Sequence, residues 1–201
     1  MENFVNVRID KQAKVSSKAT LYPNVCVLGD SVVEDGVVIF PGSVITNSKI
    51  RKNATIKSSY IEDSEVCESA AVGPFSCIRA NSKIGKCSVV GNFVEVKNST
   101  LAKGVKAKHH SYIGDADVGE NTNIGCGVIF CNYSGKLKSR IKIENDCFIG
   151  SNSNLIAPIF IAEKTYISAG STLTQSTSKY DFVISRNRET IKPDYAKKYI
   201  D

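Results

Sequence analysis

The sequence predicts an all-β protein, a left-handed parallel β-helix of hexapeptide repeats. An aliphatic residue returns every six positions along most of the chain from Ile9 to Leu173, and a small or β-branched residue usually follows four positions later. Neither the helical period of about 3.6 residues nor simple alternation explains a six-residue period with two inward positions. Hexapeptide repeats explain both. We expect the left-handed form, associated with hexad repeats of this type despite the usual right-handed crossover preference. Two packed sheets of unrelated topology are the alternative.

The repeats begin after a short lead-in, residues 1–8, and continue over residues 9–174. Three hexads make one triangular coil, so the anchors predict roughly nine coils stacked about 4.8 Å apart. One step between anchors is long, from Phe130 to Ile143. We expect the additional residues, near 131–142, to leave the prism as a basic loop.

The repeats stop after Leu173, and residues 175–201 form a C-terminal tail. Residues 181–186 have the pattern of a strand, and Pro193 marks the start of a short helix. The tail cannot bury its apolar residues alone, so we expect it to dock on the prism or on a neighbouring subunit. Exposed apolar residues on flat faces favour self-association, most naturally as a homotrimer about an axis parallel to the stack.

The composition is that of an ordinary soluble protein, with 201 residues of which 42% are hydrophobic and 23% charged. No apolar run approaches the roughly 20 residues of a membrane span, and no signal peptide is visible, so we expect a cytoplasmic protein without a membrane partner. Seven cysteines without a Cys-x-x-Cys pair favour reduced thiols over disulfides or zinc. A net charge of +6 favours an anionic ligand. Sparse aromatic residues make phosphorylated small molecules a better fit than nucleic acid.

Two cations are neighbours in the predicted coil register. Arg79 follows the anchor Ile78, and Lys97 follows Val96 one coil later. Like charges directly opposite each other destabilise a sheet unless another group compensates them. A bound phosphate would compensate both, because Arg offers a planar fork and Lys a point charge. The alternative is that both side chains extend into solvent without a ligand.

The two histidines, His109 and His110, follow the anchor Ala107 at a corner, where side chains point outward. A surface histidine pair commonly has no function, but an imidazole with an unperturbed pKa of about 6.5 can act as a base near neutral pH. A metal site is less favoured, because catalytic zinc normally has three protein ligands and no third histidine exists. Coil counting stacks His109 between Asn92 and Cys126, so a Cys–His nucleophile pair is a further alternative.

Coil counting also predicts a row of small side chains, each two positions after its anchor, formed by Asn132, Ser151 and Ala169. Such a row would form a shallow groove parallel to the axis, able to hold an extended ligand by hydrogen bonds. The alternative is that small residues at corners only allow the chain to turn.

Several motifs follow one another in a specific order along the chain: residues 72–75 with Arg79, 91–97, 107–115, 123–125, 131–133, 150–151, 157–158 and 184–186. In sequence and order they resemble the acetyltransferase domain of the bacterial bifunctional enzyme N-acetylglucosamine-1-phosphate uridyltransferase/glucosamine-1-phosphate acetyltransferase. The resemblance extends from the first coil to the tail. Full-length members of that family begin with a uridyltransferase domain, whereas this chain starts directly on the repeats, so uridyl transfer is not expected.

The resemblance implies a role for each matching residue. His109, not His110, corresponds to the general base, and Glu95 to a group that orients or polarises it. The residues corresponding to contacts with the amino sugar phosphate are Arg79, Lys97, Tyr112, Asn123 and Lys138. Those corresponding to acetyl-CoA contacts are Cys126, Asn132, Tyr133, Ser151, Ala169 and Arg186. No metal is required.

The implied reaction is the N-acetylation of glucosamine 1-phosphate to N-acetylglucosamine 1-phosphate, a step of UDP-N-acetylglucosamine biosynthesis, with acetyl-CoA as co-substrate. His109 would take the proton from the amine, and a backbone N–H within residues 125–127 would stabilise the oxyanion. Two alternatives stay open. One is a hexapeptide-repeat acyltransferase that acts on a different or nucleotide-linked amino sugar, and the other is a non-catalytic β-helical scaffold.

Overall fold

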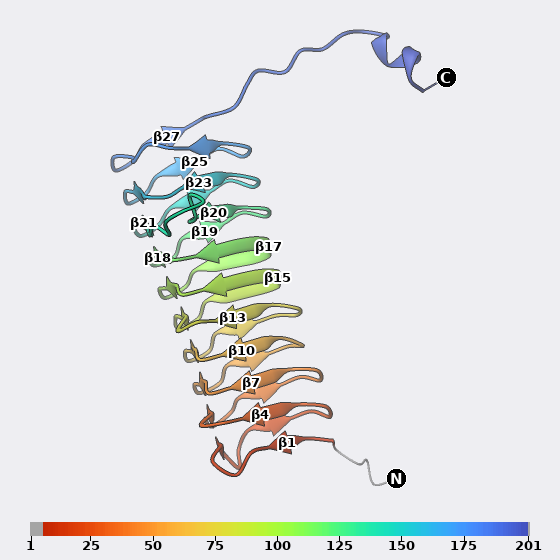
Figure 1. Cartoon of the computed structure of the whole chain (residues 1–201), viewed down its shortest axis with the longest axis vertical. Helices are drawn as coiled ribbons and strands as arrows, with labels where there is room; N and C mark the ends of the chain where they lie inside the picture. Colours follow the sequence, from red (N-terminus) through yellow and green to blue (C-terminus); the bar gives the residue numbers. More distant parts are fainter. Residues whose placement is uncertain (1–5, 201) are drawn as a thin grey trace.

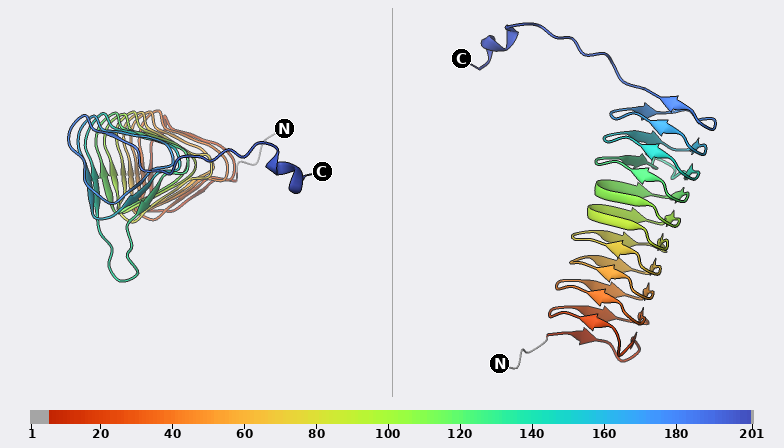
Figure 2. Two further views of the ribbon diagram at one scale, coloured as in Figure 1. Left: turned by 90° about the horizontal axis from the view of Figure 1, so that it is seen from above. Right: turned by 180° about the vertical axis from the view of Figure 1, so that it is seen from behind.

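The computed structural model describes residues 6–200 as one continuous stack of parallel strands followed by an extended tail. Figure 1 shows the coils rising from the red N-terminal end to the blue C-terminal end. The view along the axis shows a triangular cross-section (Figure 2, left). The predicted parallel β-helix is therefore present, and each full coil contributes one short strand to each of three faces.

Two faces share one hydrogen-bonded sheet because the two longest strands, β15 (Val89–Lys97) and β17 (Lys106–Gly114), turn the corner between them. The first face contains their C-terminal halves together with β1 (Arg8–Ile9), β4 (Cys26–Leu28), β7 (Val44–Thr46), β10 (Tyr60–Glu62), β13 (Cys77–Arg79), β20 (Ile129–Cys131), β23 (Asn154–Ile156) and β26 (Thr172–Leu173). The second face contains their N-terminal halves together with β3 (Thr20–Leu21), β6 (Val38–Ile39), β9 (Thr55–Ile56), β12 (Ala71–Val72), β19 (Asn123–Ile124), β22 (Phe148–Ile149), β25 (Tyr166–Ile167) and β27 (Phe182–Val183).

The third face is a separate sheet of nine strands. Its members are β2 (Lys14–Val15), β5 (Val32–Val33), β8 (Lys49–Ile50), β11 (Glu65–Val66), β14 (Lys83–Ile84), β16 (Thr100–Leu101), β18 (Ala116–Val118), β21 (Ile141–Ile143) and β24 (Ile159–Ile161). On all three faces the anchors pair with anchors, as Ile78 does with Val96 on the first face. Apart from the rows that cross the long step between Phe130 and Ile143, the register that the hexads predict is the register of the molecule.

The core is the column of anchors inside the prism. From Val27 to Leu173 every anchor of the repeat is at most 5% exposed, and Phe130 is fully buried. Burying one such side chain contributes about 1.5–3 kcal/mol. The N-terminal end is less protected, since Ile9 is 47% exposed. Stability therefore accumulates coil by coil and is lowest at the ends of the stack.

The second inward position is small because its side chain accepts a hydrogen bond from a backbone N–H of the next coil. At the corner after the first face, the N–H of Ser48 donates to Ser31 Oγ, and the N–H of Ser64 donates to Ser48 Oγ. The same bond continues through Ser82 and Ser99. A serine hydroxyl thus satisfies a buried amide that a larger apolar side chain would leave without a partner.

The long step between anchors is a loop that leaves the prism between the first and third faces, and it projects below the triangle in Figure 2 (left). The ladder continues across the loop, because β20 before it pairs with β23 after it, with Phe130 opposite Leu155. At the C-terminal end β27 pairs with β25, and a 3₁₀ helix, η1 (Tyr195–Lys198), forms near the predicted position. Side chains from Ile184 to Ile200 are exposed, and the chain after Arg186 extends away from the prism (Figure 1).

The expected docking of the tail therefore reaches the prism through residues 176–186, and docking on a neighbouring subunit stays a prediction. The described residues contain no helix that is long and apolar enough to cross a membrane.

The register predicts a gradient of stability along the stack. We expect Ile78→Ala to lower the free energy of unfolding by about 2–5 kcal/mol, because it leaves a cavity between packed coils. Ile9→Ala removes the same atoms from a half-exposed anchor and should cost less than about 1 kcal/mol. Urea denaturation measures both, and equal losses in the two variants would contradict this account of the core.

Candidate active site

One corner of the prism, where the second face turns into the first, aligns five residues in a single row that we call the corner row. The parallel register of β15, β17, β19, β22 and β25 determines its order. Main-chain hydrogen bonds of 2.8–2.9 Å join successive turns of this corner. Toward the C-terminus the row contains Asn92, His109, Cys126, Ser151 and Ala169. The predicted stacking of His109 between its two neighbours is therefore confirmed.

His109 is exposed in this row and contacts the residue one coil before it. Its Nδ1 lies 3.2 Å from Oδ1 of Asn92. Because an amide oxygen can only accept a hydrogen bond, this contact requires the proton on Nδ1, and in the neutral imidazole the lone pair is then on Nε2. His109 thereby has the tautomer that a general base needs. Sequence reasoning missed this role of Asn92, although coil counting had already made the two residues neighbours.

His110 enters a different environment although it is the next residue. Its φ of 42° lies in the left-handed region, which turns the chain at the corner. Its ring meets the edge of Phe93, with 6.5 Å between centroids, and Phe93 stacks on Phe75 at 5.6 Å. His110 therefore continues an exposed aromatic stack, whereas His109 belongs to the corner row.

Arg186 closes the C-terminal end of the corner row. Its Nη1 donates to Ser168 Oγ at 2.9 Å and to the carbonyl oxygen of Ala169 at 2.7 Å. The strand β27 supplies this residue by pairing with β25. An arginine of the tail is thus hydrogen-bonded to the corner that contains His109, at a point three coils further along the stack.

The predicted groove of Asn132, Ser151 and Ala169 is wrong in its first member. Ser151 and Ala169 are neighbours, but the residue before them in the row is Cys126, because Ile124 pairs with Ile149. Asn132 follows β20 on the first face, at another corner, and is only 7% exposed. The cause is the loop insertion, which shifts the coil count between positions 130 and 143.

The two stacked cations are neighbours as predicted, but carboxylates of the chain itself compensate them. Arg79 and Lys97 are register partners. Arg79 donates from Nε and Nη2 to one oxygen of Glu95 at 2.9 and 2.6 Å, and Lys97 Nζ lies 2.9 Å from Asp115 Oδ1. The stacking of charge therefore does not require a bound phosphate. It also directs Glu95 toward Arg79, whereas the partner of His109 is Asn92.

Asp115 is the residue of this region that sequence reasoning missed. Its side chain is buried and accepts hydrogen bonds from Lys97, Asn98 and Asn132. Burial raises the pKa of the Asp115 carboxyl, but these donors outweigh it, so the pKa lies below its ordinary value of 3.8. The available signal was an aspartate at a corner directly after an anchor and a glycine, within a motif already recognised.

The remaining predicted residues are distributed over separate surfaces. Tyr112 faces outward on the first face, and Asn123 lies on the second. Tyr133 and Lys138 form an antiparallel bridge in the projecting loop, and the Tyr133 hydroxyl donates to the Gly135 carbonyl at 2.7 Å. One copy of the chain therefore does not bring the whole predicted set together.

A shallow depression of about 210 Å³ on the first face adjoins the histidine corner. Its lining includes Phe93, Glu95, His110, Tyr112 and Ile129. It combines an acidic, an imidazole and a phenolic group on an apolar floor. Glu95 and Tyr112, which the sequence singled out, are both part of this lining.

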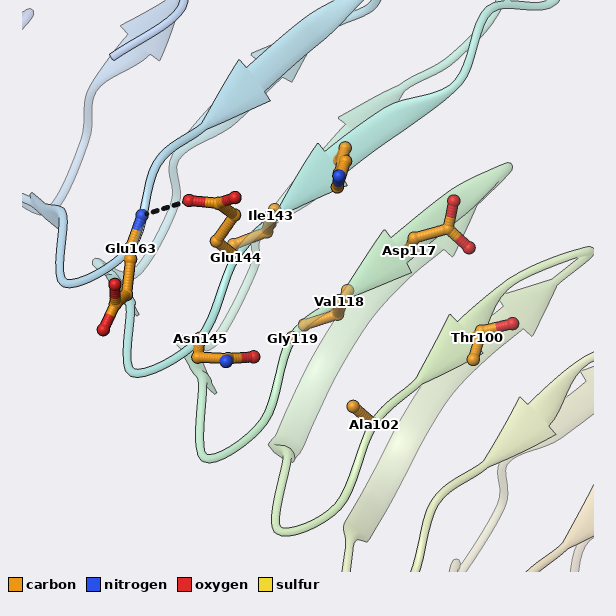
Figure 3. Close-up of a pocket in the computed structure, with 10 residues that line it drawn as sticks. Thr100, Ala102, Asp117, Val118, Gly119, Ile143, Glu144, Asn145 and Glu163 are labelled. Atoms are coloured by element: carbon orange, nitrogen blue, oxygen red, sulfur yellow. Dashed lines mark hydrogen bonds between the residues drawn. The ribbon is translucent and has the colours of Figure 1, made fainter. Parts of the chain in front are cut away.

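A larger hollow of about 380 Å³ lies on the third face and contains none of the predicted residues (Figure 3). Ala102 and Gly119 are the smallest residues of its lining. In it, the backbone N–H of Glu163 donates to Glu144 Oε2 at 3.0 Å. The hollow lies between stacked coils, and this hydrogen bond of Glu144 joins one coil of the prism to the next.

No protein-family model matches the chain. The chain is 43% identical over 190 residues to the bifunctional protein GlmU of Clostridioides difficile and 45% identical over 184 residues to that of Caldicellulosiruptor saccharolyticus. This chain is similar to the bifunctional GlmU proteins. The matches cover 94% and 92% of this chain but 41% and 40% of these relatives, so it spans about two fifths of their length. The GlmU relatives confirm the resemblance that the motifs predicted.

Solved structures with the same fold have little sequence in common with the chain. The UDP-N-acetylglucosamine acyltransferase from Campylobacter jejuni has a TM-score of 0.66 at 14% identity, covering 94% of this chain and 79% of that one. LpxA from Moraxella catarrhalis has a TM-score of 0.61 at 15% identity, covering 86% and 70%. These likenesses confirm the predicted left-handed parallel β-helix, the fold of these acyltransferases.

The buried Asp115 carboxylate predicts a dependence of stability on pH. Because its folded pKa is depressed, its contribution is present above the unfolded pKa of 3.8 and is lost as the pH falls through the lower folded value. We expect Asp115→Asn to lower the free energy of unfolding by about 1–3 kcal/mol at pH 7. Urea denaturation of parent and variant should show this difference shrinking below pH 4. A difference that grows on acidification would contradict the assignment.

Proposed function

We propose that the chain transfers the acetyl group of acetyl-CoA to the amine of glucosamine 1-phosphate. The observation that carries the proposal is the corner row. It contains His109, whose Nε2 is free, and Arg186 lies at its C-terminal end. The GlmU relatives support the choice of reaction, because the predicted acetyltransferase motifs lie in the region that matches them. The product, N-acetylglucosamine 1-phosphate, then serves UDP-N-acetylglucosamine synthesis.

Acetyl-CoA would lie along the corner row. At about 4.8 Å per coil, Arg186 is roughly 15–20 Å from His109, which suits an extended ligand with its thioester at one end and phosphates at the other. The side chains between them, Cys126, Ser151 and Ala169, are small and exposed. Small side chains let a pantetheine arm approach the backbone, and Arg186 would bind a CoA phosphate through its guanidinium.

The amino sugar phosphate would bind on the first face beside the histidine corner. Arg79 is 42% exposed and only partly occupied by Glu95, so its guanidinium can reorient toward a phosphate. Lys97 presents a second positive charge one coil later, although its ammonium is more buried. Tyr112 lies opposite Glu95 in the register and lines the depression in which a sugar ring would fit.

The chemistry needs a base and an oxyanion donor. His109 Nε2 would take a proton from the ammonium of the sugar and pass it to solvent, and the freed amine would attack the thioester carbonyl. As the C–S bond breaks, the nitrogen would lose a second proton, which His109 would transfer to the leaving CoA thiolate. In the corner of residues 125–127, the N–H groups of Gly125 and Gly127 are already bonded to main-chain carbonyls. The N–H of Cys126 is therefore the donor we assign to the oxyanion.

The distribution of the predicted residues over two faces and a projecting loop supports a site shared between copies of the chain. Asn123 on the second face and Lys138 in the loop would reach the amino sugar held by a neighbouring copy. A homotrimer with parallel axes satisfies this arrangement, because around a threefold axis one face of each prism meets a different face of the next copy.

The assignment of the base predicts a difference between two adjacent residues. His109→Ala should lower kcat by about 10²–10⁴, since general-base assistance is lost. His110→Ala is the matched control and should stay within a few-fold of the parent. Release of free CoA in the presence of acetyl-CoA and glucosamine 1-phosphate measures both. Loss of activity in His110→Ala alone would disprove the assignment, and release with another amine only would disprove the substrate.

The shared site predicts complementation between two impaired variants. His109→Ala and Lys138→Met, unfolded together and refolded as a mixture, should regain activity. In mixed assemblies some sites combine an intact His109 from one copy with an intact loop from another. Each variant refolded alone is the control. A mixture no more active than the mean of the two controls would show that each copy works with its own loop.

A further inference from the structure

The loop of residues 131–142 carries three of the predicted ligand contacts, Asn132, Tyr133 and Lys138, yet its tip has few partners. Tyr133 is 59% exposed and Leu137 is 72% exposed. The loop is closed at its neck, where the N–H of Ser139 donates to the carbonyl of Asn132 at 2.8 Å. The contacts between this neck and the prism therefore determine the positions of Tyr133 and Lys138.

The outgoing strand of the neck is fastened by Asp115. The Asn132 amide donates to Asp115 Oδ2, and both side chains are buried. The same carboxylate accepts from Lys97 and Asn98, and the main-chain carbonyl of Asp115 accepts the N–H of Ile141 at 3.0 Å. One residue thus contacts both strands of the neck and the Lys97 ammonium.

The returning strand is fastened by Asp117, two positions further on. Arg140 donates from Nε and Nη2 to the two oxygens of Asp117, each at 2.6 Å. It also donates to the carbonyl oxygens of Ala116 and Asn98 at 3.1 Å. In Figure 3 the Asp117 side chain stands out from β18 with both oxygens away from the sheet.

We propose that Asp115 and Asp117 form a clamp that positions the loop, and with it Lys138 and Tyr133, for acetyl transfer. Neither carboxylate touches the reacting atoms in this scheme, so both are positioning residues. The proposal rests on the proposed function for its effect on activity, but the clamp itself is a property of the fold. It connects the Lys97 corner, which would hold the phosphate, with the loop that would complete the site.

The two halves of the clamp differ in strength. Asp115 has three side-chain donors in a buried setting, and an isosteric amide would place an NH₂ group against donors that need an acceptor. The Asp117–Arg140 pair is 46% and 45% exposed, so solvent screens it and can replace it. We therefore expect Asp115 to contribute more than Asp117 to the position of the loop.

The first test is hydrogen exchange of the loop in Asp115→Asn, Asp117→Asn and a matched control, Asp63→Asn. Asp63 occupies the equivalent left-handed corner three coils earlier and is exposed. We expect amides of residues 131–142 to exchange about tenfold faster or more in Asp115→Asn, up to about threefold faster in Asp117→Asn and unchanged in Asp63→Asn. Acceleration throughout the prism, or none in the loop, would overturn the clamp.

The second test separates positioning from a general loss of structure. We expect Asp115→Asn to lower kcat/KM for glucosamine 1-phosphate about tenfold or more in the parent, but less than about threefold in a Lys138→Met background, since the loop contact is already lost there. An equal loss in both backgrounds would overturn the proposed route through the loop. A parent that releases no CoA with this acceptor would disprove the proposed function instead, while the exchange measurement would still judge the clamp.

Discussion

In-register stacking of inward side chains, coil upon coil at about 4.8 Å, is the constraint on which the rest of the molecule depends. Each anchor is covered by the anchors of adjacent coils, and each strand amide finds its carbonyl one coil away. A shift of one residue would expose the buried positions and lose these bonds. The corner row exists for this reason, because residues far apart in the sequence, such as His109 and Ala169, must lie in one line.

The same constraint explains how much the sequence could predict. The faces, the core, the neighbours of His109 and the pairing of Arg79 with Lys97 all follow from counting anchors. Counting failed once, at Asn132, because the loop adds residues between two anchors without adding a turn to the prism. The position of an insertion within a coil is not encoded in the repeat, so the rows on either side of it were misaligned.

The partners of charged groups could not be predicted by counting. Register makes Arg79 and Lys97 neighbours, but long side chains reach across the surface to whichever carboxylate lies nearby. Glu95 and Asp115 each neutralise one cation, and the resulting pairs change what the cations can do. A phosphate must then compete with a carboxylate at Arg79, which favours a ligand of higher charge and a geometry that a single carboxylate cannot match.

A prism of this kind cannot move the residues of its corner row relative to one another without breaking its own ladder. Moving His109 relative to Arg186 would require neighbouring coils to slip, which costs several main-chain hydrogen bonds and buried anchors together. In the proposed scheme, adjustment to substrate must therefore come from side chains and from segments outside the ladder, such as the loop of residues 131–142. Asp115 and Asp117 hold the neck of this loop, while its tip is exposed. The corner row would then set distances along the stack, and the loop would add Lys138 to a site on a neighbouring copy.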